Sequence, residues 1–230
     1  MLKERPILFS APMVRALLAG TKTQTRRVLK PCKDLGIGCE LAPCELAGEV
    51  NAGDYSNAKY RPGDRLWVRE TSRAHELTDK EAEADTFGVI ERLGLEVPPC
   101  GLDGVVYAAD NAFREIENSR EASERWMKMN AYRGMQGATV PAIHMPRWAS
   151  RITLEVTGVR VERLQEISEA DAIAEGVNVH PDHHGKPRTS IYSPVQAYRD
   201  LWESINGPGS WEANPLVWVV EFKRVEFSPC

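Results

Sequence analysis

The segment of residues 20–27 holds the densest group of charged and hydroxyl-bearing side chains in the chain. It reads Gly-Thr-Lys-Thr-Gln-Thr-Arg-Arg, so a lysine, threonine hydroxyls and two guanidinium groups lie within eight residues. Lys22, Arg26 and Arg27 could neutralise a polyanion such as phosphate in a local basic cleft. The simpler alternative is a solvated basic turn that binds nothing.

A second candidate binding segment contains Arg147, Trp148 and Arg151. An exposed aromatic ring between two guanidinium groups can stack a nucleobase and neutralise its phosphate. The equally simple alternative is a buried tryptophan with arginines beside the start of a strand. By residue type alone, Glu175 before Gly176 has the character of a surface acid at the end of a helix.

The cysteines and histidines do not form a recognisable metal motif. Cys32, Cys39 and Cys44 lack the closely spaced Cys-x-x-Cys pairs of a zinc knuckle, and Cys100 or a histidine would have to supply a fourth ligand. The other group, His180, His183 and His184, lies in a polar loop where no regular element positions the ligands. We therefore expect no metal and no other cofactor.

Composition indicates an ordinary globular protein. Of its 230 residues, 42% are hydrophobic and 27% are charged, and the formal net charge is −4. That charge argues against binding nucleic acid through bulk electrostatics, so any polyanion site must be local. An odd number of cysteines, five, favours a reducing compartment. With no apolar run long enough to cross a membrane and no signal peptide, the sequence predicts a cytoplasmic location.

The elements that must position these residues are mostly short strands. A helix capped by Ser10 should end near Gly20, and the basic segment should continue from a loop into a strand. Residues 61–64 have the Pro-Gly pattern of a type II turn before an alternating strand at 65–70. Further strands are expected at 105–107, 151–157, 159–164 and 216–222, and helices at 120–129, after Ser168 and after Ser193.

Two long segments, about 30–60 and 71–141, show no clear period and are interpreted as insertions. Because short strands dominate and helices are few, the sequence predicts a mainly β, α+β fold built on a small mixed barrel.

The basic segment resembles the signature of the ASCH family, Gly-x-Lys-x-x-(Glu or Thr)-x-Arg, which Gly20, Lys22, Thr25 and Arg27 fill here. Similarity extends to residues 62–68, 167–175 and 216–223, and residues 143–151 resemble a segment of larger ASCH proteins from bacteriophages and prophages. The similarity covers about half of the chain. It implies a single PUA-like β-barrel domain spanning residues 1–230, with a few packed helices and the two insertions.

The resemblance also implies an activity. The small amidohydrolase branch of the family removes the acetyl group from N4-acetylcytidine with a Lys, a Thr and a Glu, and these roles transfer to Lys22, Thr25 and Glu175. A lysine of lowered pKa could take the proton of the Thr25 hydroxyl, which would then attack the amide carbonyl. Glu175 would hold Lys22 or the departing amine.

Two further functions stay open at this point. One is a non-catalytic module that binds RNA or a modified base, and the other is a ribonuclease. In each case the expected partner is RNA or a nucleoside or nucleotide, and no membrane is expected. The expected nucleic-acid contacts are Arg26, Arg27, Arg147, Trp148 and Arg151.

Overall fold

A computed structural model describes residues 3–36, 38–78, 102–177 and 193–225 of the chain. Strands and α-helices both contribute, in line with the predicted α+β class. No helix in these ranges combines the length and apolar character that a membrane crossing requires. The chain divides into two compact units, which are Met1–Arg5, Ala16–Leu66 and Ile152–Cys230 for the first, and Pro6–Arg15 and Trp67–Arg151 for the second.

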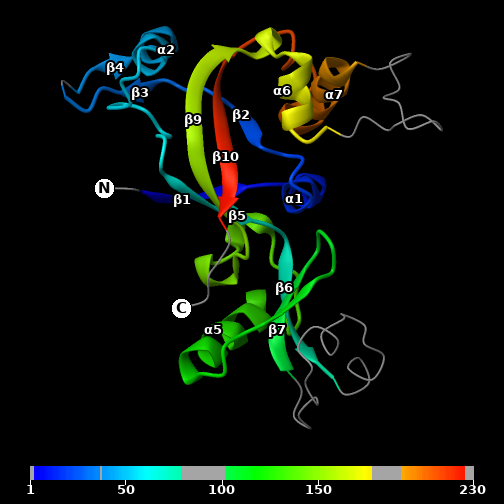
Figure 1. The fold of residues 1–230 in the computed structure, drawn as a ribbon. Coiled ribbons are helices and arrows are strands. Elements are labelled where there is room, and N and C mark those ends of the chain that lie inside the picture. The colour runs from blue at the N-terminus through cyan, green and yellow to red at the C-terminus, as the bar shows by residue number, and fades with distance from the viewer. Residues whose placement is uncertain (1–2, 37, 79–101, 178–192, 226–230) are drawn as a thin grey trace. The chain divides into compact units, whose positions relative to one another are not determined.

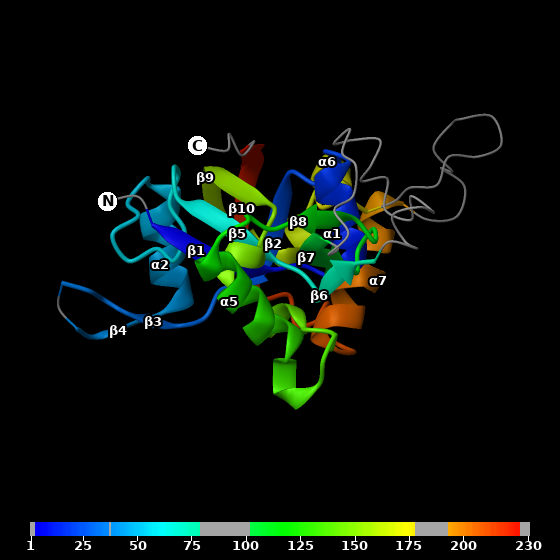
Figure 2. The ribbon, with the colours of Figure 1, turned by 90° about the horizontal axis from the view of Figure 1, so that it is seen from below.

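The largest sheet has the strand order β1-β5-β9-β10-β2. Strands β9 and β10 pair antiparallel along their length and lie side by side in both views (Figures 1 and 2). Strand β10 also pairs antiparallel with β2, where Val219 lies opposite Arg26 and Val220 lies opposite Thr25. In the described ranges β1 and β2 are the outer strands, and the closed PUA-like barrel stays a prediction. The bounds are β1 Glu4–Leu8, β2 Gln24–Val28, β5 Arg65–Arg69, β9 Thr153–Arg163 and β10 Leu216–Val225.

Helices α6 (Glu169–Ala174) and α7 (Pro194–Asn206) pack against each other beside this sheet (Figure 1). The Ser168 hydroxyl accepts a hydrogen bond from a backbone N–H at the start of α6, and Ser193 does the same for α7. These caps satisfy donors that a helix start leaves open, which confirms both predicted helix starts. A buried cluster beneath the helices includes Tyr198, Trp202, Trp211, Val217 and Val219.

The predicted insertion at about 30–60 forms part of the first unit. It contains the short strands β3 (Cys32–Lys33) and β4 (Glu40–Leu41) and the helix α2 (Pro43–Asn51). The Asn51 side-chain amide exchanges two hydrogen bonds with the backbone of Val161 in β9, both of 2.9 Å. The helix is thereby tied to strand β9 of the sheet.

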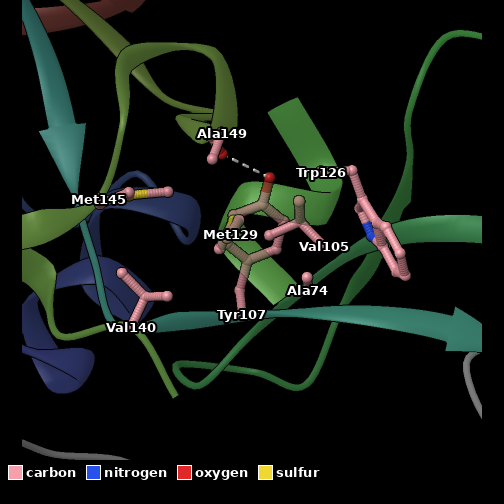
Figure 3. Close-up of a cluster of buried hydrophobic side chains, with 8 residues drawn as sticks. All are labelled: Ala74, Val105, Tyr107, Trp126, Met129, Val140, Met145 and Ala149. Carbon is pink, nitrogen blue, oxygen red and sulfur yellow. Dashed lines mark hydrogen bonds between the residues drawn. The ribbon is translucent and has the colours of Figure 1, made fainter. Parts of the chain in front are cut away.

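The second unit contains the whole of the predicted insertion at 71–141. Its sheet has the order β6-β7-β8, formed by Ser72–Leu77, Leu102–Tyr107 and Phe113–Glu115. Helix α5 (Arg120–Asn130) buries Trp126 and Met129 in the core of this unit (Figure 3). Two elements were predicted correctly here, the strand over 105–107 and the helix over 120–129. Three-residue 3-10 helices follow at Tyr132–Gly134, Ala142–His144 and Arg147–Ala149.

Gly104 allows the close packing of β7 in this core. A Cβ atom at this position would lie 2.3 Å from Phe113 Cζ and 2.7 Å from the backbone oxygen of Arg114. We expect Gly104→Ala to lower the free energy of unfolding by about 1–3 kcal/mol, because the backbone cannot yield. Gly48→Ala in α2 is the control, since nothing lies within 4 Å of its added Cβ, and it should stabilise by about 0.5–1 kcal/mol. Urea unfolding measures both, and equal effects would contradict the expectation.

Tyr107 lies at the centre of the same core. Its hydroxyl donates a hydrogen bond of 2.8 Å to the backbone oxygen of Ala149 (Figure 3). Burial raises the pKa of Tyr107 to about 12, because the phenolate would lose its hydration.

We expect the stability advantage of the unmodified protein over Tyr107→Phe to shrink and reverse between about pH 10 and about pH 12. In the unfolded chain the phenol loses its proton near pH 10, whereas the folded protein keeps it, so rising pH favours the unfolded state in this window. The pKa difference of two units costs the folded protein about 3 kcal/mol of stability at high pH. The hydrogen bond to Ala149 contributes only about 1 kcal/mol, so the net effect of the hydroxyl changes sign. Urea unfolding at several pH values gives the difference in the free energy of unfolding between the two proteins. The contributions of other titrating groups are the same in both and cancel from this difference. A difference independent of pH would contradict this expectation.

Candidate functional site

Lys22 lies in the turn after α1 (Ala11–Leu18). Gly20 has a φ of 74°, and the backbone N–H groups of Thr21 and Lys22 both donate to the backbone oxygen of Ala16, at 3.0 and 3.2 Å. Lys22 then forms an isolated antiparallel bridge with Glu175, directly after α6. The turn after one helix is therefore bound to the end of another, far along the chain.

The Lys22 ammonium group is buried against Glu175. Its Nζ donates hydrogen bonds to the Glu175 carboxylate oxygen Oε2 and to the Glu175 backbone oxygen, both of 2.8 Å. The two side chains are 0% and 2% exposed. Burial lowers the pKa of Lys22, Glu175 acts in the opposite direction, and the nearby charges of Arg27 and Arg26 lower it further.

Gly176 makes this approach possible. Its φ is +81°, and an added Cβ would lie 2.9 Å from Ala16 Cβ and 3.0 Å from Lys22 Cβ. A side chain at this position would therefore push the end of α6 away from the turn that carries Lys22.

Arg26 completes the surroundings of Glu175. Its guanidinium lies 3.3 Å from Glu175 Oε1 and 3.2 Å from Asp171 Oδ2, and its Nε donates to Glu162 at 3.1 Å. Lys22, Arg26, Glu162, Asp171 and Glu175 together are called the Lys22–Glu175 cluster below. Because three carboxylates already compensate the buried Arg26 charge, the predicted role of Arg26 as a phosphate contact does not fit this arrangement.

Thr25 is not joined to this cluster. In β2 the Gln24 and Arg26 side chains both reach Asp171, so the alternation of a strand directs Thr25 to the opposite face of the sheet. Thr25 is buried, and within the described ranges its hydroxyl makes no hydrogen bond to Lys22 or Glu175. Of the three predicted catalytic residues, Lys22 and Glu175 lie together and Thr25 lies apart. Arg27, also on β2, is half-buried.

The Lys22–Glu175 cluster contains residues that sequence reasoning missed. Glu162 lies on β9 and Asp171 on α6, and nothing in their local sequence marks them as partners of Arg26. One available signal was the spacing of two residues from Lys22 to Gln24 to Arg26, which a strand places on one face.

In the second unit Arg151 is held by two carboxylates. Its guanidinium makes two hydrogen bonds of 2.9 Å with Glu70 and two of 2.9 Å with Asp110, and it stacks 4.0 Å from the centre of the Tyr107 ring. Burial raises the pKa of Glu70, and Arg151 acts in the opposite direction. These pairs raise the pKa of Arg151, although burial alone would lower it. The predicted contact of Arg151 with nucleic acid therefore does not fit the structure.

Arg147 and Trp148 do not form the expected stacking platform with Arg151. The Arg147 guanidinium lies 5.8 Å from the centre of the Trp67 ring. Trp148 is half-buried and packs against the core of the second unit, while its backbone oxygen accepts a hydrogen bond from Arg114 at 2.7 Å. This is close to the alternative interpretation of a largely packed tryptophan.

Cys32, Cys39 and Cys44 are free thiols, the first half-buried and the others exposed. Within the described ranges, no three or more His, Cys, Asp or Glu side chains are placed to hold a metal ion. The loop with His180, His183 and His184 lies outside the described residues.

Comparison with protein-family models, with curated proteins and with solved structures finds no match to this chain.

Proposed function

We propose that this chain is an ASCH-like protein with a PUA-like fold that hydrolyses the amide of an N4-acylated cytidine. Lys22 is the general base and Glu175 is its positioning partner. The observation that carries the proposal is the buried contact of 2.8 Å between Lys22 Nζ and Glu175 Oε2, two residues 153 positions apart. The expected compartment is the cytoplasm, and the expected ligand is a modified nucleoside, free or within RNA.

The chemistry rests on the lowered pKa of Lys22. Burial increases the fraction of neutral amine near neutral pH, and only the neutral amine can accept a proton. Lys22 takes a proton from a nucleophile as its oxygen bonds to the acyl carbon. The carbon–nitrogen bond then breaks, and the Lys22 ammonium returns the proton to the departing cytidine amine. With water as the nucleophile, the products are acetate and cytidine.

The position of Thr25 favours water as that nucleophile. The resemblance implies attack by the Thr25 hydroxyl, but β2 directs this side chain away from the face that carries Arg26. Glu175 accepts the hydrogen bond that fixes the Lys22 amine, and Arg26 in turn holds Glu175.

The direct test is incubation of the full chain with N4-acetylcytidine, both as the free nucleoside and within a short RNA. We expect acetate and cytidine to appear together in equal amounts, measured by chromatography of the nucleosides. If neither substrate loses its acetyl group at any pH from about 6 to about 10, the hydrolase proposal is wrong.

A second candidate function is a non-catalytic module that binds RNA or a modified base. It is favoured by the burial of the Lys22 and Glu175 side chains, which are 0% and 2% exposed and so are closed to a substrate in this conformation. In this case the Lys22–Glu175 cluster only supports the fold. The same RNA would then bind without losing its acetyl group, while strand cleavage would instead indicate a ribonuclease.

A further inference from the structure

A hollow of about 250 Å³ lies in the second unit. Its lining residues do not include any residue of the Lys22–Glu175 cluster. One wall comes from α5, where Arg125 and Lys128 share a face at helical spacing, and from Tyr132 after the end of this helix. The other wall comes from residues 140–148 and includes His144 and Trp148. The hollow thus combines three rings with two cationic side chains.

We propose that this hollow binds a single nucleotide unit, with its base against the rings and its phosphate beside Arg125 and Lys128. The proposal goes beyond the hydrolase function and does not depend on it. Stacking on aromatic rings beside cationic side chains is the usual chemistry by which proteins hold single nucleotides.

Two of the three rings lie close together. The Tyr132 and His144 rings lie 5.8 Å apart with an angle of 40° between their planes. Tyr132 and Trp148 are half-buried and pack against the core of the unit, so the chain already holds them in place. Met129 and Val140, both buried, add apolar surface to the hollow. A preformed ring surface reduces the entropy that binding must overcome.

The cationic side chains are accessible to an anion. Lys128 is exposed and, in the part of the chain that the structure describes, has no carboxylate within ion-pair distance. Arg125 pairs with Glu121 on the surface of α5, where the two side chains are 50% and 74% exposed. Such an exposed pair is weak, so a phosphate can compete for the guanidinium.

The volume of the hollow, about 250 Å³, limits what it can hold. The volume lies just below the range of about 300–1000 Å³ that is typical of small-molecule sites, which suits one ring system rather than several.

The test measures binding of the four nucleoside 5′-monophosphates to the full chain by calorimetry. Cytidine without phosphate and ribose 5-phosphate without base are the ligand controls. We expect saturable binding of at least one nucleotide and at least about fivefold weaker binding of both controls, because each lacks one half of the contacts. A single-stranded oligonucleotide forms a second arm, which shows whether the nucleotide unit is taken free or from a strand.

Two variants assign the binding to the hollow. Lys128→Gln and Tyr132→Leu should each weaken nucleotide binding about fivefold to tenfold, through loss of a charge-assisted contact and of an aromatic ring against the base. Arg120→Gln is the matched control, because Arg120 lies on the same helix, is 94% exposed and does not line the hollow. The Arg120→Gln protein should bind nucleotide as the unmodified chain does.

The proposal fails if neither nucleotides nor the oligonucleotide bind, or if ribose 5-phosphate binds as tightly as the nucleotides. It also fails if Lys128→Gln and Tyr132→Leu bind nucleotide as the unmodified chain does. Deacetylation is not part of this measurement, so its outcome is separate from that of the hydrolase proposal.

Discussion

Lys22→Arg is expected to reduce the deacetylation of N4-acetylcytidine by about a hundredfold or more. Arginine keeps the positive charge that Glu175 and its neighbours compensate, but a guanidinium does not release its proton near neutral pH and cannot act as a base. The measurement is kcat/KM from the release of cytidine, with the thermal unfolding midpoint recorded for the same protein. Full deacetylation by folded Lys22→Arg protein would end the case for Lys22 as the base.

The pH dependence adds a second measure of the same role. Because burial lowers the pKa of Lys22 from its usual 10.5, the rate should rise with pH through an apparent pKa below that value. A rate that is independent of pH up to about 10 would not fit a lysine base.

Two further variants test the roles of Glu175 and Thr25. Glu175→Gln keeps the shape of the side chain but removes the charge that holds the ammonium, so we expect a smaller loss of activity and a shifted pH profile. Thr25→Val should cost less than about fivefold if water is the nucleophile. A loss as large as that of Lys22→Arg would instead return Thr25 to the role that the family resemblance implies.

The largest stability effect is expected for Arg151→Met in the second unit. The Glu70 side chain is 2% exposed, and removal of Arg151 leaves its carboxylate buried without its main cationic partner. Breaking a buried ion pair in this way costs about 3–5 kcal/mol. Urea unfolding monitored by circular dichroism measures the loss.

Arg120→Met is the matched control for this change. Arg120 pairs with Glu124 at 3.1 Å in the same unit, but the side chains are 94% and 52% exposed, so the cost should stay below about 1 kcal/mol. The double variant Glu70→Gln/Arg151→Met should recover part of the loss, because it leaves no buried charge at position 70. Equal costs for Arg151→Met and Arg120→Met would show that the Arg151 pairs add nothing to stability.

Local rules predicted the elements whose ends carry strong signals. The turn at residues 61–64 forms as expected, with a Gly63 φ of 88° and a hydrogen bond of 3.0 Å from Asp64 N to Arg61 O. Ser168 and Ser193 cap their helices, and Gly20 follows the end of α1 with a positive φ. Each of these features depends on a few neighbouring residues, which is why the sequence reveals it.

Helix α2 was missed for an identifiable reason. Its N-cap is Ala42, which has no side-chain acceptor, and only Leu46 and Val50 are buried along it. Two apolar positions are too few to show a helical period, and the helix depends on its packing beside β9.

The sequence by itself determined the residue types near Lys22 and the local turn before it, and the family resemblance led to the expectation that Glu175 would hold Lys22 or the departing amine. Strand alternation alone places Arg26 and not Thr25 on the face of Gln24, but only the tertiary structure decided that Glu162 of β9, Asp171 and Glu175 meet Arg26 on that face. The sequence also did not reveal that Lys22, Arg26 and Arg151 are largely buried, because basic segments of this kind are usually solvated. Their carboxylate partners lie as far as 153 residues away, and only strand pairing and helix packing bring such charges together.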